Sequence, residues 1–248
     1  MANYSTKFRI RTSDLDEYDH LKPYVYFDFF QDVAGFHAES IGLGYKDTID
    51  KNIAWILMKN KVSIYDYPAP YEIITVKTFP TEINKLDFIR DYEVFNQNNQ
   101  IIARGTSQWC IVDIDTKKIL RTNALNFPSE LNEPSFYNEK IAKINLVNTN
   151  ELTKKSEYVT QYSDLDHYHH ANNARYAEMI YNAIDLRNVF VTEMILNYNL
   201  ETPVNKKLSI FTRDNNNCGK IEIEGTGINE DNRTSFSFRI KGNIMKSE

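Results

Sequence analysis

The chain has 248 residues and a mass of 29.0 kDa, enough for one large domain or two domains of ordinary size. Its net charge of −5 argues against general nucleic-acid binding. No apolar run reaches the roughly 18 residues that a membrane span requires, and residues 1–6 lack the apolar core of a signal peptide. We therefore expect a cytoplasmic protein without nucleic-acid or membrane partners.

The first half predicts a strand, an acidic segment with a histidine, a helix and four further strands. The opening strand is expected at residues 7–11 and the acidic segment at 13–20. Pro23 suits the first turn of the helix, and Gly42 and Gly44 end it. The apolar stripe of this helix carries Tyr26, Phe29, Phe30, Val33 and His37. The later strands are expected at residues 54–63, 72–79, 88–95 and 101–114, with a turn at 96–99.

The second half repeats this order at an offset of 150 residues. The octet Ser-Asp-Leu-Asp-x-Tyr-x-His stands at residues 13–20 and again at 163–170, and seven of the fourteen positions from 13 to 26 are identical to their partners. So long a period predicts a duplicated domain rather than an array of short units. The remaining elements are a strand at 158–162, a helix with Tyr176, Met179, Ile180 and Ala183 on its buried face, and strands at 193–200, 208–212, 221–225 and 234–240.

A strand, a helix and four strands, twice over, is the element order of a hotdog domain, in which a curved antiparallel sheet wraps a long helix. We predict an α+β tandem double hotdog with an N-terminal domain at 1–135, a linker at 136–150 and a C-terminal domain at 151–248. The alternative is two tandem α+β domains on a flexible linker. Because the repeat already supplies the usual pairing of two sheets, we expect a monomer or a homodimer.

The second octet predicts an active site. If the segment is extended, Asp166, Tyr168 and His170 share one face, just ahead of a helix start that offers unpaired N–H groups. Such groups can polarise a carbonyl and stabilise an oxyanion. The first octet runs into Pro23, which has no N–H, where the second half has Asn173. The second half is therefore the better candidate.

Two other interpretations stay open for these residues. Aspartates before a helix are common caps, and Asp164 and Asp166 fit that role as well as a catalytic one. Together with His167, His169 and His170 they also resemble metal ligands. Adjacent histidines on one strand face opposite sides, however, and no second cluster completes a site, so we predict neither a metal nor a cofactor.

The segment from Asp164 to Tyr176 resembles the motif Asp-Leu-Asp-x-Asn-x-His-x-Asn-Asn-x-x-Tyr of the fatty acyl-ACP thioesterases of plants and their bacterial relatives. The Trp55 strand, the Arg90-Asp91 pair and residues 104–109 are also similar to family landmarks. The resemblance implies three catalytic residues, Asp166, His170 and Glu201, the last in a strand after the helix. Tyr168 replaces the family asparagine, and Thr202 stands where plant members have a cysteine.

The family activity implied is hydrolysis of an acyl-acyl carrier protein thioester to a free fatty acid, with acyl carrier protein as the partner. Glu201 or Asp166 would be the general base, with Tyr168, Asn172 and Asn173 in support, and backbone amides of residues 172–175 would hold the oxyanion. The acyl chain would lie beneath the first helix, lined by Phe29, Phe30 and Trp55. The alternatives are an acyl-CoA thioesterase, a hotdog dehydratase and a non-catalytic acyl-chain-binding module.

Overall fold

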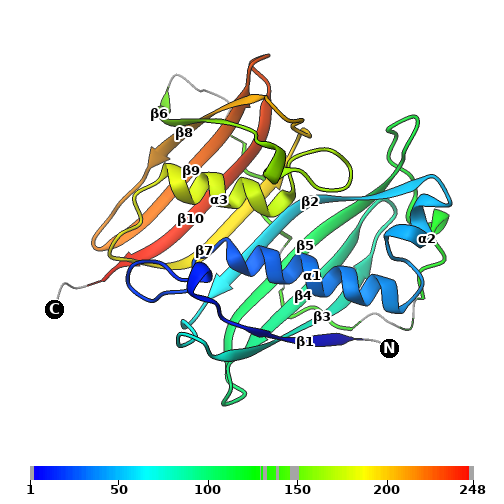
Figure 1. Cartoon of the computed structure of the whole chain (residues 1–248), viewed down its shortest axis with the longest axis horizontal. Helices are drawn as coiled ribbons and strands as arrows, with labels where there is room; N and C mark the ends of the chain where they lie inside the picture. Colours follow the sequence, from blue (N-terminus) through cyan, green and yellow to red (C-terminus); the bar gives the residue numbers. More distant parts are fainter. Residues whose placement is uncertain (1–2, 129, 131–132, 138–139, 146–150, 246–248) are drawn as a thin grey trace. The chain divides into compact units, whose positions relative to one another are not determined.

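The computed structural model describes residues 3–128, 130, 133–137, 140–145 and 151–245. The chain divides into two compact units, Met1–Ile141 and Ala142–Glu248. Each unit is a helix lying on an antiparallel sheet of five strands (Figure 1). This is the hotdog arrangement predicted for each half. The expected linker at 136–150 falls partly outside the described residues.

The sheet of the first unit has the strand order β1-β3-β4-β5-β2 and packs against helix α1, Val25–Ser40 (Figure 1). A short helix, α2 (Tyr45–Ile49), follows α1. The strands are β1 (Tyr4–Arg9), β2 (Ile53–Ile64), β3 (Ile73–Ile83), β4 (Phe88–Phe95) and β5 (Ile101–Asp113). The strand predicted at 88–95 has the bounds of β4, and the others differ by a few residues at their ends.

Helix α1 buries the stripe that its periodicity predicts, since all five stripe side chains are buried. It begins at Val25, because residues 22–25 form a turn in which Val25 N–H donates to Lys22 O at 3.0 Å. Pro23 therefore precedes the helix and is not in its first turn. At the other end, Gly42 adopts a φ of 70°, which favours glycine. Gly44 is the N-cap of α2 and does not end α1.

The packing beneath α1 depends on a residue without a side chain. The ring of Phe30 stacks on Tyr92 of β4 with ring centroids 4.3 Å apart. A Cβ atom on Gly105 of β5 would lie 2.1 Å from Cε2 of Phe30. Only glycine at position 105 leaves room for this ring, so the close contact between helix and sheet is set at one position.

The sheet of the second unit has the order β7-β10-β9-β8-β6 and packs against helix α3, Asn173–Ala183 (Figure 1). Tyr176, Met179 and Ile180 are buried as predicted, and Ala183 is half-buried. The strands are β6 (Thr153–Val159), β7 (Val189–Tyr198), β8 (Lys207–Asp214), β9 (Lys220–Asn229) and β10 (Thr234–Ile244).

The first strand of each unit ends earlier than predicted. Strand β1 ends at Arg9 and β6 at Val159, although residues 7–11 and 158–162 were the expected strands. In both units a short 3-10 helix follows, Thr12–Asp14 and Tyr162–Asp164. The aspartate that ends each 3-10 helix accepts a hydrogen bond from a backbone N–H three residues earlier, which turns the chain out of the sheet.

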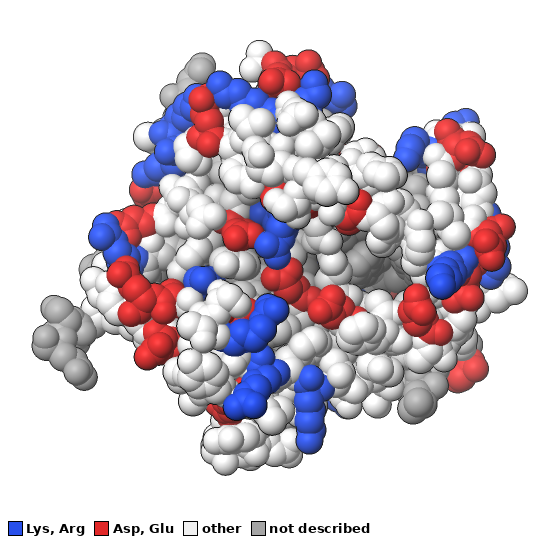
Figure 2. Space-filling model, in the orientation of Figure 1, with Lys and Arg blue, Asp and Glu red and all other residues white. Residues whose placement is uncertain are grey.

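Two lysines of the second unit, Lys154 and Lys207, are surface residues that share one acidic neighbour. Lys154 and Lys207 lie 2.5 and 2.6 Å from the Glu157 carboxylate, and their hydrogen bonds lower the pKa of Glu157 to about 2. Figure 2 likewise shows basic and acidic side chains interspersed over the face in view. Among the described residues, no helix is long and apolar enough to cross a membrane.

The two cysteines are not joined. Cys110 is buried in β5 and Cys218 is exposed. Burial raises the pKa of the Cys110 thiol to about 11, so this thiol stays protonated at neutral pH. Cys110 is thus a small buried residue, as its apolar sequence neighbours indicate.

Candidate active site

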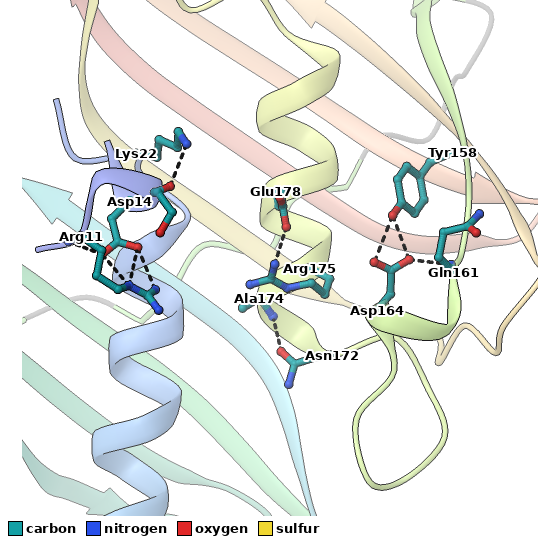
Figure 3. Close-up of polar contacts among 11 residues, drawn as sticks. Arg11, Asp14, Lys22, Tyr158, Gln161, Asp164, Asn172, Ala174, Arg175 and Glu178 are labelled. Carbon is teal, nitrogen blue, oxygen red and sulfur yellow. Dashed lines mark hydrogen bonds and ion pairs between the residues drawn. The ribbon is translucent and has the colours of Figure 1, made fainter. Parts of the chain in front are cut away.

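The first aspartate of each octet is a structural residue. Asp164 accepts the Gln161 N–H at 2.7 Å, and the hydroxyl of Tyr158 donates to its two carboxylate oxygens at 3.0 and 2.9 Å (Figure 3). In the first unit the guanidinium of Arg11 binds Asp14 in the place of that tyrosine (Figure 3). Both aspartates are buried caps, so the capping interpretation holds for this position of the octet.

The segment after the cap is a closed turn and does not have the extended form under which Asp166, Tyr168 and His170 would share one face. Its ends are joined by a β-bridge between Leu165 and Ala171 and by the Asp166 N–H, which donates to His170 O at 2.9 Å. The Asp166 carboxylate accepts the Tyr168 N–H at 2.8 Å, and His169 has a φ of 65°. This side chain-to-backbone bond stabilises a turn over an extended chain. Asp166 and His170 are therefore paired across the neck of a loop.

His170 meets Glu201 at the base of this loop. Its Nε2 atom lies 3.4 Å from Oε2 of Glu201. The side chains are 26% and 47% exposed, so both can reach a substrate. The resemblance implies a strand at Glu201. Strand β7 ends at Tyr198, however, so Glu201 lies after the strand and not in it. A backbone hydrogen bond from Ala171 N–H to Thr202 O, 2.9 Å long, holds the two segments together.

The start of α3 uses most of its backbone donors within the protein. Asn172 is the N-cap, and its side-chain oxygen accepts the Ala174 N–H at 2.9 Å (Figure 3). The Asn172 N–H donates to Asp164 O at 2.8 Å, and the Arg175 N–H donates to Asn172 O at 2.9 Å. Of the amides at 172–175, the Asn173 N–H alone has no partner among the described residues. The expected group of oxyanion donors is thus reduced to one.

The loop of the first unit has the matching backbone hydrogen bond and the matching positive φ, but its histidine has a different neighbour. The Asp16 N–H donates to His20 O at 2.9 Å, and Asp19 has a φ of 62°. The ring of His20 stacks on Tyr67 with centroids 4.6 Å apart, whereas His170 faces the Glu201 carboxylate. The duplication preserved the loop, and the two halves differ in what the histidine contacts.

The three aromatic residues expected in the acyl-chain pocket lie in separate packing contacts. Phe29 stacks on Phe8 at 4.7 Å, and Phe30 lies over Tyr92 and Gly105. Trp55 lies in a separate apolar cluster near α2 and donates its indole N–H to Leu43 O at 3.0 Å. The cluster around it contains Leu43, Ile53, Phe88, Ile111 and Leu125.

The Arg90-Asp91 landmark is buried in the first unit. Arg90 donates to the Thr78 hydroxyl at 3.2 Å, and the same nitrogen lies 2.9 Å from Nδ1 of His37 on α1. Burial lowers the pKa of Arg90. The Ser135 hydroxyl donates to Asp91 at 2.6 Å. These contacts connect helix to sheet, so the pair serves the fold of this unit.

Two buried hydroxyl groups of the second unit were not recognised from the sequence as neighbours of the candidate site. They belong to Tyr176 and Thr202, and both are buried. The repeat contained a signal for the first, because Tyr26 and Tyr176 occupy matching positions. Within the described ranges, no group of three or more His, Cys, Asp or Glu side chains could hold a metal ion.

Two family models match the chain. The model of the acyl-ACP thioesterase N-terminal domain matches residues 1–124, and that of the C-terminal domain matches residues 147–243. Together they cover most of both units and the whole of the candidate site.

Curated relatives are chloroplastic plant enzymes. An oleoyl-acyl carrier protein thioesterase of Coriandrum sativum is 23% identical over 214 residues, which are 77% of this chain and 56% of the relative. A palmitoyl-acyl carrier protein thioesterase of Gossypium hirsutum is 25% identical over 192 residues, 70% of this chain and 45% of the relative. The chain thus spans about half the length of these relatives.

Solved structures share the fold over nearly the whole chain. An acyl-ACP thioesterase from Bacteroides thetaiotaomicron has a TM-score of 0.87 at 19% identity, with 98% of both chains covered. The 12:0-ACP thioesterase from Umbellularia californica has a TM-score of 0.82 at 15% identity, with 98% of this chain and 94% of that chain covered. With both of its domain models matched in order along the sequence, the chain belongs to the acyl-ACP thioesterase family.

Proposed function

We propose that this protein hydrolyses the thioester of a fatty acyl-acyl carrier protein and releases the free fatty acid. The observation that carries the proposal is the His170–Glu201 pair, 3.4 Å apart beside the start of α3. Family membership supports acyl carrier protein as the partner that delivers the substrate. In the proposed reaction the nucleophile is water.

Glu201 is the better general base of the two carboxylates that the resemblance offers. Asp166 already accepts the Tyr168 N–H and maintains the shape of the loop. The Glu201 carboxylate is half exposed and lies beside an imidazole, so it can contact both His170 and an incoming water. A general base must lie within hydrogen-bond reach of the proton that it removes. We assign Asp166 to loop positioning and Glu201 to proton transfer.

The proposed reaction has two steps. The water oxygen attacks the thioester carbonyl carbon while Glu201 takes a proton from that water, and the carbonyl oxygen becomes an oxyanion. The Asn173 N–H and the positive end of the α3 dipole stabilise this oxyanion. The carbon–sulfur bond then breaks, and the proton on Glu201 passes to the departing carrier thiolate. His170 holds Glu201 in place and stabilises its charge.

The acyl chain is proposed to bind in the apolar interior of the N-terminal unit. The aromatic residues Phe29 and Phe30 on the buried face of α1 support this assignment. Trp55 would support the end of the acyl-chain site, because the hydrogen bond from its indole N–H to Leu43 O fixes the position of its ring. Replacing Phe29 with Ala should change the preferred chain length in a panel of acyl carrier protein substrates. An unchanged profile would contradict this placement.

The central test compares variants of the two repeats. His170→Ala and Glu201→Gln should lower kcat on acyl-acyl carrier protein by about 100-fold or more, since Glu201 takes the proton of the attacking water and His170 holds Glu201 in place. His20→Ala removes the matching histidine of the first unit and should keep near-normal turnover. Near-normal turnover of His170→Ala or Glu201→Gln would contradict the assignment.

The same preparations distinguish the alternative functions. Faster turnover of acyl-CoA than of acyl-acyl carrier protein would indicate an acyl-CoA thioesterase. Formation of an enoyl product from a 3-hydroxyacyl substrate would indicate a dehydratase. Saturable binding of acyl chains without any product would indicate a binding module.

A further inference from the structure

One hydrogen bond joins the start of α3 to the end of strand β7. The phenol hydroxyl of Tyr198, the last residue of β7, donates to the backbone carbonyl oxygen of Asn173 at 3.2 Å. Asn173 is the first residue of α3, and its N–H is the oxyanion donor of the proposed reaction. A carbonyl oxygen has two lone pairs, so it can accept this bond and a helical bond together. The phenol therefore ties the residue that carries the donor to a strand of the sheet.

The same strand end also positions the proposed general base. Glu201 lies three residues after Tyr198, and the two residues between them are bonded to the neighbouring strand segment. The Asn199 N–H and the Leu200 N–H both donate to Ser235 O, at 2.9 and 3.1 Å. The base and the oxyanion donor are therefore both fixed relative to Tyr198, one through the chain and the other through the phenol.

The ring of Tyr198 has a packing contact that does not involve its hydroxyl. It lies edge-on to the buried ring of Tyr176 on α3, with centroids 5.9 Å apart and an interplanar angle of 63°. A phenylalanine would keep this contact between the rings. The substitution Tyr198→Phe therefore separates the effect of the hydrogen bond from that of the packing.

The first unit has the matching loop start without this hydroxyl. The Tyr65 N–H and the Asp66 N–H both donate to Ile102 O, at 2.8 and 3.1 Å, which is the bonding found in the second unit. The residue before them is Ile64, the last residue of β2, which therefore stands in the place of Tyr198. Ile64 is buried and has no hydroxyl group.

The repeats thus differ at both ends of this hydrogen bond. Pro23 has no N–H in the place of Asn173, and Ile64 has no hydroxyl in the place of Tyr198. The phenol occurs in the repeat that has a backbone donor to orient, and not in the repeat that has none.

We infer that Tyr198 is a positioning residue that keeps the Asn173 N–H directed at the oxyanion. The inference rests on the proposed function, in which this N–H stabilises the oxyanion and Glu201 is the general base. An oxyanion-hole donor acts at about 2.7–3.1 Å, and a misplacement of about 1 Å can cost about 100-fold in rate. Because helix ends fray, a bond from the sheet to the first residue of α3 maintains that distance.

The kinetic test measures kcat and KM for Tyr198→Phe in three backgrounds, the native protein, Asn173→Ala and Asn173→Pro. In the first two backgrounds kcat should fall about five- to tenfold, as expected for one lost hydrogen bond. KM should change little, because the interaction with the oxyanion is made only in the transition state. The proline background has no N–H to orient, so Tyr198→Phe should not lower kcat further there. An equal fall in the proline background, or no fall in the native background, would overturn the inference.

The matched control is Tyr158→Phe, measured at a temperature at which both variants are folded. It also removes hydrogen bonds of a phenol in the second unit, those to the Asp164 carboxylate. It leaves the bond between Tyr198 and Asn173 in place, so kcat should stay close to the native value. If Tyr158→Phe lowered kcat as much as Tyr198→Phe, a general loss of stability would account for both effects and the inference would fail.

Hydrogen exchange of the backbone amides tests the positioning without turnover. The amides in the first two turns of α3 should exchange faster in Tyr198→Phe than in the native protein, because the helix start has lost its bond to β7. Unchanged exchange would refute the inference even in an active enzyme. If the native protein hydrolyses no acyl-acyl carrier protein, the proposed function fails, and the exchange rates still decide whether Tyr198 holds the start of α3.

Discussion

Asn173 and Pro23 occupy the same place in the two repeats, directly after a residue that bonds to the capping aspartate. The Asn172 N–H donates to Asp164 O at 2.8 Å, and the Lys22 N–H donates to Asp14 O at 3.0 Å. One residue later the second unit has an N–H that no described residue accepts, at the start of α3, and the first unit has a proline without an N–H. This backbone donor is thus a second chemical difference between the repeats, beside the contacts of His170 and His20.

The first prediction concerns a substitution that removes the Asn173 N–H. Asn173→Pro removes the N–H and should lower kcat by about 10²–10³-fold, the usual effect of losing one oxyanion-hole donor. The fold should persist, because proline is well accepted at the first position of a helix. Asn173→Ala keeps the N–H and should retain most activity in the same release assay. Equal activity of the proline and alanine variants would exclude the Asn173 N–H as an oxyanion donor.

The second prediction concerns the cap of the second unit. Tyr158→Phe removes both hydrogen bonds to the buried Asp164 carboxylate and should lower the free energy of unfolding by about 1–2 kcal/mol. Thermal unfolding measures this, with Tyr162→Phe as the control, because that side chain is 87% exposed.

The cap also has a predicted pH dependence. Burial and Asp164 raise the pKa of Tyr158 from 10.0 to about 12. A group whose pKa is raised by folding adds stability below its unfolded value and loses that contribution as pH rises through the folded value. The difference between the native protein and Tyr158→Phe should therefore narrow between pH 10 and 12. A constant difference over that range would contradict the role of the protonated hydroxyl.

The third prediction uses the buried carboxylate of Asp91. Burial raises the pKa of Asp91 above its ordinary value of 3.8, and hydrogen bonds from Ser135 and Thr106 oppose the effect. The folded state therefore binds this proton more tightly than the unfolded state, and ionisation costs stability. Relative to Asp91→Asn, the native protein should lose stability as pH rises from below 3.8 through the folded-state value, and then level off.

Chemical unfolding at a series of pH values measures this difference. Ser135→Ala removes a bond that lowers the pKa of Asp91, so it should enlarge the effect. If Asp91→Asn and the native protein had parallel stability curves, Asp91 would not be the group responsible.

The fourth prediction compares two glycines of the first unit. Gly105→Ala places a Cβ atom 2.1 Å from Phe30, and it should cost about 1–3 kcal/mol through overpacking. Gly35 lies within α1, and a Cβ there meets nothing within 4 Å. Gly35→Ala should therefore raise the free energy of unfolding by about 0.5–1 kcal/mol, since glycine weakens a helix interior. If both substitutions raised the free energy of unfolding, the Phe30 ring would be able to move aside for the new Cβ atom.

Much of the fold could be predicted from local patterns. The helical spacing from Tyr26 to His37 places one face of α1 in the core, and the strand runs of both halves follow in the correct order. Periodicity works here because burial acts on every residue of an element. It does not locate the ends of β1 and β6, where the caps of Asp14 and Asp164 redirect the chain.

The shape of the candidate site could not be predicted in the same way. An extended chain would place Asp166, Tyr168 and His170 on one face, but the Asp166 carboxylate bonds to the Tyr168 N–H and closes a turn. Position 201 was known only from the family resemblance, which implied a strand. The partner of Glu201 depends on a contact between distant segments, the backbone bond from Ala171 to Thr202.

The sequence by itself determined that this protein is a duplicated α+β chain, because identical residues recur at one offset and each half has the same hydrophobic periods. It also located the asymmetry, since proline and asparagine differ in possessing an N–H. Only the tertiary structure decided which aspartates are caps and which amide at the start of α3 has no partner among the described residues. Those properties depend on hydrogen bonds between segments that are far apart in the chain, and no local pattern encodes them.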